Sequence, residues 1–348
     1  MAYGTLATDA ISTSGNLAVT GNITPTGGVY APNGPGINRI INGAMNIDQR
    51  NAGASQNITA AAALAYTVDR WYAYCTGANV TGQRVTNTGT TTAPSQYAYQ
   101  FTGAASVTAI GFAQRIEAVN CYDLAGTTAT LSVNLSNSLL TTVTWTAYYA
   151  NTADTFGTLA SPTRTQIATG TFTVTSTITR YNTQITIPSA ATTGIEIVFT
   201  VGAQTSGTWV IGNVQLEAGS MMSYFERRHI TQELSLCQRY YYQVMASNAA
   251  GGSLSMWGGY LRGTTAFEGY HKQHPVPMRG TPTIGYNGTV GNYNVYNGST
   301  AGAVSAISGS ADSYGVILSI TTVQTYSVGT GAQFYANQGN NINFTSEL

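Results

Sequence analysis

The chain has 348 residues, of which only 7% are charged, and its 13 basic residues balance 13 acidic ones. A neutral chain without a basic cluster argues against nucleic acid as a partner, because binding phosphates needs concentrated positive charge. No apolar run approaches the ~18 residues of a membrane span, and the N-terminus lacks the basic and apolar regions of a secretory signal. We therefore expect synthesis in a cytoplasm and no membrane insertion.

The rest of the composition favours β-structure. Glycine (39 residues) and tyrosine (23 residues) are abundant. Aromatic and β-branched side chains suit a pleated sheet, while glycine and asparagine supply turns, so all-β is the expected fold class. So low a charge is unusual for a freely soluble monomer, which indicates that sister subunits or a larger assembly cover much of the surface.

Residues 1–36 form the first predicted segment. A Gly-Asn-apolar unit occurs at residues 15–17 and again at residues 21–23. One chain cannot bury these apolar side chains alone, whereas winding with copies of itself would, so the repeat indicates a fibrous oligomerisation segment. A disordered arm is the alternative. Proline and glycine between residues 24 and 36 mark the boundary with the next domain.

Residues 37–228 form the first predicted globular domain. Alternation of apolar and polar residues recurs there between short, turn-rich connections, as in a two-sheet sandwich of the jelly-roll type. The predicted strands are 97–102, 107–115, 128–135, 142–149, 166–174, 179–187, 194–201 and 209–216.

One short helix is predicted at the joint that follows. Thr231 is the expected N-cap, and Glu233 lies where the helix dipole favours negative charge. Leu234, Cys237 and Tyr241 then share one face. We expect four charged side chains to fix the angle between the two domains through ion pairs: Glu226, Arg227, Arg228 and Glu233.

Residues 229–348 are predicted to form a smaller β-domain that binds a receptor or partner. Its expected strands are 254–261, 264–271, 281–286, 292–296, 315–321 and 332–335. Five tyrosines lie close to its turns, where ring faces can stack on a sugar and nearby amides can bind its hydroxyls: Tyr293, Tyr296, Tyr314, Tyr326 and Tyr335. The alternative is that these rings pack against the β-surface or a subunit boundary.

The few acidic residues give little sign of catalysis. A glycosidase needs two carboxylates at a defined separation, one of them held protonated as the acid. Glu196 and Glu217 are candidates, but nothing in the sequence places a partner beside either, so we expect no enzyme activity. Asp69 and Arg70, next to Trp71, are expected to form a structural ion pair.

No metal centre or other cofactor is indicated. The cysteines are widely spaced and lack CxxC pairing, so we expect buried free thiols at Cys75, Cys121 and Cys237. The histidines lack zinc-motif spacing: His229, His271 and His274. Asp48 is a candidate calcium ligand, but calcium takes roughly six to eight oxygen ligands and only one or two can be named.

Six segments together resemble bacteriophage and prophage tail-fibre-like virion proteins, in that family's order. They are residues 38–50 (NRIINGAMNIDQR), 66–71 (YTVDRW), 213–220 (NVQLEAGS), 225–229 (FERRH), 233–241 (ELSLCQRYY) and 275–283 (PVPMRGTPT). The resemblance implies a virion appendage on the tail or head of the particle. It also implies a usually trimeric protein whose jelly-roll is similar to carbohydrate-binding modules.

Two functions stay open at this point. The first is a short tail fibre or spike, joined to other virion proteins through residues 1–36, that binds host cell-surface polysaccharide. Its weak single-site contacts would be multiplied by presentation as a homotrimer. The second is a purely structural adaptor, collar or head-decoration fibre without glycan binding.

Overall fold

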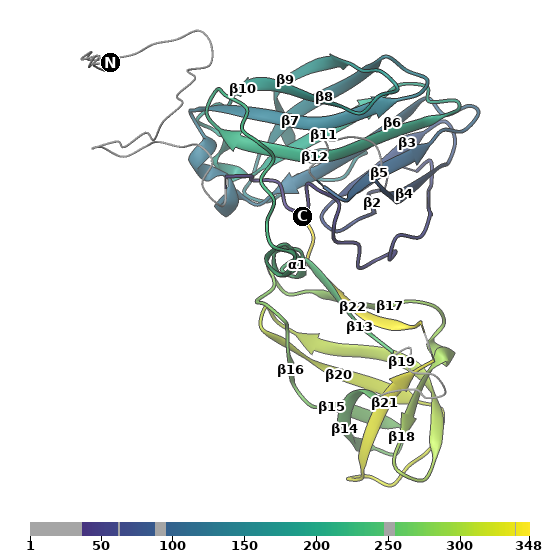
Figure 1. Ribbon diagram of the computed structural model, residues 1–348. Coiled ribbons are helices and arrows are strands. Elements are labelled where there is room, and N and C mark those ends of the chain that lie inside the picture. The colour runs from purple at the N-terminus through teal and green to yellow at the C-terminus, as the bar shows by residue number, and fades with distance from the viewer. Residues whose placement is uncertain (1–36, 62, 88–94, 247–254, 338) are drawn as a thin grey trace, which may run out of the picture.

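The computed structural model describes residues 37–61, 63–87, 95–246, 255–337 and 339–348. Within them, one α-helix, α1 (Ile230–Gln238), stands between two β-bodies (Figure 1). The prediction of an all-β chain with a sandwich, a smaller C-terminal β-domain and one short helix between them is confirmed. The predicted anchor at residues 1–36 lies outside the described residues. No described helix is long and apolar enough to span a bilayer.

The first body is a sandwich of two antiparallel six-stranded sheets. Their strand orders are β1-β4-β5-β12-β7-β10 and β2-β3-β6-β11-β8-β9. The strands are β1 (Gln56–Ile58), β2 (Ala65–Tyr66), β3 (Tyr72–Thr76), β4 (Val80–Thr86), β5 (Tyr97–Thr102), β6 (Ala109–Ile116), β7 (Thr128–Asn137), β8 (Thr142–Ala150), β9 (Arg164–Thr173), β10 (Thr179–Thr186), β11 (Ile195–Val201) and β12 (Thr208–Ala218). Strand β12 lies between β5 and β7, so sheet neighbours are distant in the sequence, as in jelly rolls.

A continuous apolar core fills the space between these two sheets. The rings of Trp71 and Phe112 stack with centroids 4.7 Å apart, and those of Phe101 and Trp209 stack at 5.1 Å. All four side chains are fully buried. Burying an apolar side chain of this size stabilises a fold by on the order of 2 kcal/mol, so these rings hold the sheets together.

The second body contains two antiparallel sheets. One has the order β13-β22-β17 and the other β15-β14-β21-β18-β19-β20-β16, in which β15 also pairs with β20. The strands are β13 (Tyr241–Met245), β14 (Ser255–Gly263), β15 (Ala266–Gly269), β16 (Lys272–Gln273), β17 (Thr283–Tyr286), β18 (Tyr293–Tyr296), β19 (Ala301–Ala311), β20 (Gly315–Thr322), β21 (Gly331–Ala336) and β22 (Asn341–Thr345). Because of the extra pairing, β15, β14, β21, β18, β19 and β20 form a closed ring around an apolar core.

Helix α1 begins one residue before the predicted cap. Its N-cap is His229, whose imidazole Nδ1 accepts a hydrogen bond from the Thr231 amide at 3.4 Å. The prediction of Thr231 as N-cap is therefore wrong, because Thr231 already lies inside the first turn. Cys237 points into a small apolar cluster with Ile41 and Ile47 of the sandwich domain, so the helix packs against the first body.

Candidate functional site

Two of the five predicted tyrosines belong to the core of the second body. The Tyr293 ring stacks on Phe334 with centroids 5.8 Å apart, and its hydroxyl donates to the Asn341 carbonyl at 2.7 Å. The Tyr326 hydroxyl donates to the Val295 carbonyl at 2.8 Å. Both rings are buried. This burial corrects the expectation that Tyr293 and Tyr326 face a sugar.

The other three tyrosines lie on the surface but do not form one site. Tyr314 is 68% exposed in the turn before β20, and Tyr335 is half-buried opposite Asn294. Tyr296, at the end of β18, lines a groove in the outer face of the ring of strands. Of the five, Tyr296 alone lies in this groove, and a tyrosine that sequence reasoning missed, Tyr270, lines it as well.

The groove has a volume of about 370 Å³. Its lining residues are Gly258, Gly259, Tyr270, Tyr296, Asn297, Gly298, Gly331, Ala332 and Gln333. Strand pairing fixes their order across the sheet, because Tyr296 lies opposite Gln333, and Gln333 lies opposite Gly258. The Tyr270 amide donates to the Gly258 carbonyl at 2.9 Å. Two exposed rings are thus separated by a glutamine and a glycine.

Glycine keeps the floor of this groove open. A Cβ added to Gly331 would meet no atom within 4 Å, and one added to Gly258 would lie 3.7 Å from the Tyr270 ring. Side chains at these positions would therefore project into the groove rather than into the protein. The bare backbone leaves the faces of Tyr270 and Tyr296, which are 62% and 38% exposed, accessible to a ligand.

The predicted ion pairs at the joint exist for three of the four residues. The Arg228 guanidinium lies 3.5 Å from the Glu226 carboxylate and 3.4 Å from that of Glu233. It also donates to the carbonyl of Asn38. Arg227 is exposed and makes no hydrogen bond or ion pair with the described residues, so its predicted role is not supported. These pairs tie the helix to the start of the sandwich domain.

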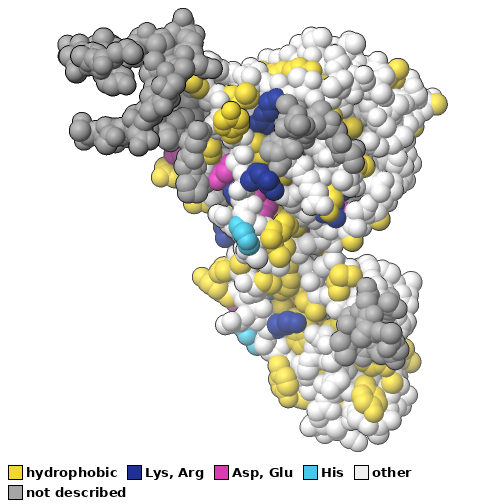
Figure 2. Space-filling view, in the orientation of Figure 1, with side chains coloured by type: hydrophobic (Ala, Val, Ile, Leu, Met, Phe, Trp, Pro, Cys, Tyr) yellow, Lys and Arg dark blue, Asp and Glu magenta, His cyan; other side chains and the backbone are white. Residues whose placement is uncertain are grey.

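A second set of contacts closes the joint from the C-terminal side. The Glu347 carboxylate accepts from Arg50 at 2.9 Å and pairs with Arg70. The Arg115 guanidinium donates to the Leu348 carbonyl at 2.8 Å. In Figure 1 the chain returns from β22 to the underside of the sandwich. Charged side chains on the face in Figure 2 gather over this joint. The C-terminal residues therefore fasten the two bodies together.

The predicted ion pair between Asp69 and Arg70 is wrong. Arg70 pairs instead with Glu347 and stacks on the Tyr240 ring, 3.5 Å from its centroid. Asp69 accepts from the Gln49 amide at 3.1 Å and lies 3.5 Å from Arg50. Adjacent residues point in different directions here because Arg70 has a left-handed backbone, with φ 72°.

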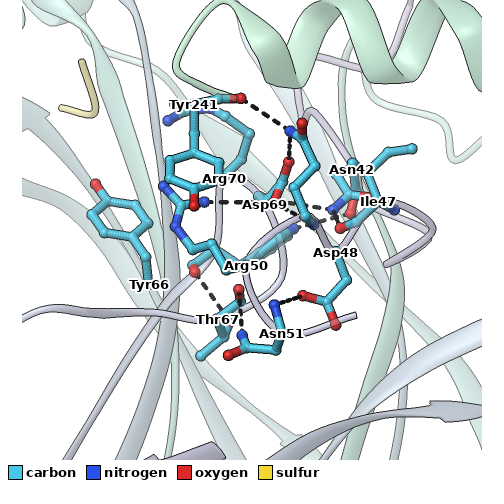
Figure 3. Close-up of polar contacts among 12 residues, drawn as sticks. Asn42, Ile47, Asp48, Arg50, Asn51, Tyr66, Thr67, Asp69, Arg70 and Tyr241 are labelled. Atoms are coloured by element: carbon cyan, nitrogen blue, oxygen red, sulfur yellow. Dashed lines mark hydrogen bonds and ion pairs between the residues drawn. The ribbon is translucent and has the colours of Figure 1, made fainter. Parts of the chain in front are cut away.

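Asp69 belongs to a cluster of polar side chains that also contains Asp48, Arg50 and Tyr241 (Figure 3), and its pKa is raised. Its side chain is fully buried, and burial raises the pKa of its carboxyl to about 6, against the opposing attraction of Arg50. Gln49 connects the cluster to the second body, because its side-chain amide donates to the Tyr241 carbonyl at 3.0 Å. A titrating group therefore lies at the contact between the two bodies.

Neither candidate acid is accessible to a substrate. Glu196 is fully buried; it accepts from Arg115 at 2.7 Å and from the Tyr72 hydroxyl at 2.5 Å, and it pairs with Arg164. Glu217 is 1% exposed and accepts from the Ser223 hydroxyl at 2.5 Å. Both carboxylates are buried and engaged in structural hydrogen bonds or ion pairs, which corrects their candidacy as a catalytic acid.

The side chains considered as metal ligands have other roles. Asp48 accepts from the backbone amides of Asn51 at 3.1 Å and Gly53 at 2.7 Å, so it stabilises its own turn. The three cysteines are buried free thiols, as predicted. The His274 ring hydrogen-bonds the Tyr242 hydroxyl at 2.6 Å. Among the described residues, no three His, Cys, Asp or Glu side chains form a group that could hold a metal.

No protein-family model and no curated protein matches the chain. Among solved structures, it is similar to the enzymatically active domain of tailspike protein 4 of bacteriophage CBA120, with 18% identity and a TM-score of 0.35, over 53% of this chain and 22% of that one. It is also similar to TmCBM61 in complex with β-1,4-galactotriose, with 12% identity and a TM-score of 0.34, over 52% of this chain and 99% of that one.

A third similar structure is the family 11 carbohydrate-binding module of a cellulosomal cellulase of Clostridium thermocellum. The identity is 13% and the TM-score 0.29, over 51% of this chain and all of that one. Likeness at these TM-scores decides neither a fold family nor a function, so the function has to be inferred from the geometry of this chain.

Proposed function

We propose that this protein binds a glycan, without acting on it, through the groove on the outer face of its C-terminal domain. One observation carries the proposal. Two exposed tyrosine rings, Tyr270 and Tyr296, flank an open floor that also presents the amide side chains of Gln333 and Asn297.

Sugar chemistry matches this arrangement. One face of a pyranose ring exposes mainly C–H groups, which stack on an aromatic ring, while its hydroxyls need hydrogen-bond donors and acceptors. The groove volume of about 370 Å³ lies within the ~300–1,000 Å³ typical of small-ligand sites. A short stretch of an extended glycan is therefore a suitable occupant.

The makeup of the groove supports binding without hydrolysis. Hydrolysis of a glycosidic bond usually needs two carboxyl groups, roughly 5–9.5 Å apart, facing the sugar. The described residues that line the groove include no carboxylate. Glu268, the carboxylate on the neighbouring strand β15, accepts from the Tyr260 hydroxyl at 2.7 Å and pairs with Arg262 at 3.3 Å.

In the particle, the protein would act as a short tail fibre or spike in host attachment. The six sequence segments that resemble tail-fibre-like virion proteins support this role, as does a chain with only 7% charged residues. Joined to other virion proteins through residues 1–36 and presented as a homotrimer, three weak grooves would bind host cell-surface polysaccharide with much higher avidity than one.

A specific surface feature favours the alternative, a purely structural adaptor, collar or head-decoration fibre. Met221, Met222 and Tyr224 follow β12 and are 75%, 42% and 93% exposed. Adjacent exposed apolar side chains of this kind often mark a protein-binding surface. Such a surface is compatible with glycan binding elsewhere, and absence of glycan binding would leave it as the main functional feature.

The test is a glycan array with the purified full-length chain, followed by titration of the best ligand into three variants. We expect Tyr270→Ala and Tyr296→Ala each to raise Kd about tenfold, a loss of about 1.4 kcal/mol, because each removes a stacking surface. Tyr314→Ala is the matched control, since Tyr314 is exposed but outside the groove, and it should bind like the wild type. The proposal fails if no glycan binds at millimolar concentration, or if all three variants bind equally.

A further inference from the structure

One polar side chain in the groove, that of Gln333, has no hydrogen-bond partner among the described residues. It lies between Tyr296 and Gly258 on the exposed face. A carboxamide offers an oxygen acceptor and an NH₂ donor side by side. Gln333 thus presents both to whatever occupies the groove.

The neighbouring polar groups are partly engaged. The Asn297 side-chain oxygen accepts from the amide of Thr300 at 2.9 Å, so its NH₂ group is the part left for a ligand. The Tyr296 hydroxyl donates to the Gly298 carbonyl at 2.7 Å, which leaves its oxygen as an acceptor. Donors and acceptors are therefore both available, and both are neutral.

Charge is absent from the walls of the groove. None of its described lining residues is Asp, Glu, Lys, Arg or His. The charged side chains of β14 and β15, Arg262 and Glu268, pair with each other at 3.3 Å. Lys272 of β16 lies over the Trp257 ring, 4.7 Å from its centroid, and does not line the groove. A carboxylate or phosphate placed here would lose water without gaining a cation from any lining residue, which costs binding energy. A hydroxyl, which both donates and accepts, meets matching groups.

We infer that the groove takes an uncharged saccharide, and that Gln333 determines its specificity by binding two adjacent ring hydroxyls. The amide oxygen would accept from one hydroxyl and the NH₂ group would donate to the next. Tyr270 and Tyr296 would contact the apolar faces of the sugar on either side. This inference rests on the proposed function and names the ligand class for the same site.

The test compares neutral cello- and galacto-oligosaccharides with acidic oligogalacturonates by titration calorimetry, using wild type, Gln333→Glu and Gln273→Glu. Glutamate has the shape of glutamine but replaces the NH₂ donor with an acceptor, so Gln333→Glu should weaken binding of the neutral ligand about tenfold. Gln273, exposed on β16 outside the groove, is the control and should have no effect. Thermal melting of each variant verifies that it is folded.

Ionic strength gives an independent readout. Binding of a neutral ligand should be unchanged between low and high salt, because no charge pair is screened. Preference for the acidic ligand with affinity that falls as salt rises, or wild-type affinity in Gln333→Glu, would overturn the inference and leave glycan binding intact. If neither class of ligand binds, the proposed function itself fails, and the inference fails with it.

Discussion

At the joint, a fully buried Asp69 lies 3.5 Å from Arg50 and accepts hydrogen bonds from Gln49. Burial of the charged form outweighs these attractions and raises its pKa to about 6, from an ordinary value of 3.8. The pKa of Glu233, which is largely buried in the same joint, is raised for the same reason. Carboxylates here bind protons more readily in the folded chain than in the unfolded chain.

This difference predicts the direction of a pH effect. Between about pH 4 and pH 6 the folded chain holds a proton on Asp69 that the unfolded chain lacks. The protonated Asp69 therefore contributes its full share to the unfolding free energy below about pH 4, and this contribution is lost as pH rises through 6. The rise of the Asp69 pKa corresponds to a change of about 3 kcal/mol in the unfolding free energy across this pH range. In urea denaturation at pH 4 to 7.5, Asp69→Asn should remove this part of the pH dependence of the unfolding free energy.

The control for this experiment is Asp123→Asn, because the Asp123 side chain is 44% exposed in a surface pair with Arg39. It should leave the pH dependence as in the wild type. An Asp69→Asn curve parallel to the wild-type curve would contradict the assignment of the effect to Asp69.

Among the elements, the segment that leads into α1 carries the contacts that fasten the helix to the sandwich. Arg228 is 7% exposed in its side chain and contacts Glu226, Glu233 and the carbonyls of Asn38 and Ile40. Arg227 precedes it but faces solvent. These two neighbouring arginines carry the same charge, but only Arg228 makes hydrogen bonds and ion pairs with the described residues.

We therefore predict a large loss of stability for one of two matched substitutions and almost none for the other. Arg228→Ala should lower the unfolding free energy by about 3–5 kcal/mol, because it removes the cation that pairs with the largely buried Glu233. Arg227→Ala should change it by less than about 0.5 kcal/mol, as surface substitutions usually do. Chemical denaturation measures both, and an equal loss in the two variants would contradict this account of the joint.

Most strands with regular alternation were predictable from the sequence, although β22 (Asn341–Thr345) alternates and was not predicted. The eight strands predicted in the sandwich agree with the structure to within two residues at each end. Strand β19 was missed because Ala301–Ala311 is rich in small and polar residues (AGAVSAISGSA) and reads as a loop. It forms through pairing with β18 and β20, and such long-range partners leave no local signal.

Of the five turn-associated tyrosines of the C-terminal domain that were predicted to bind sugar, only Tyr296 lines the candidate groove. The burial of Tyr293 depends on Phe334, which is distant in the sequence. Tyr270 joins the site because its backbone pairs with Gly258. Only the closure of the ring of strands determines which tyrosine side chains face inward and which face outward.

In the whole molecule, the sandwich and the second body differ in structure and in position relative to the groove. The sandwich and the joint give a stable base, with ion pairs around Arg228 and Glu347 on the two sides of the contact. The second body projects from this base (Figure 1), and its outer face carries the groove. This position of the groove, away from the base, is compatible with the proposed role in binding a host polysaccharide.

Filling the groove with a side chain distinguishes a glycan site there from one elsewhere on the protein. In Gly331→Leu, the added side chain projects from β21 into open space, so the fold should be retained while the groove is blocked. Gly291→Leu is the control, because Gly291 also has open space around its Cβ but lies outside the groove. Binding of each variant to purified host-envelope polysaccharide is then measured by surface plasmon resonance. We expect Gly331→Leu to abolish binding and Gly291→Leu to bind like the wild type. Wild-type binding by a folded Gly331→Leu variant would show that the groove is not the binding site.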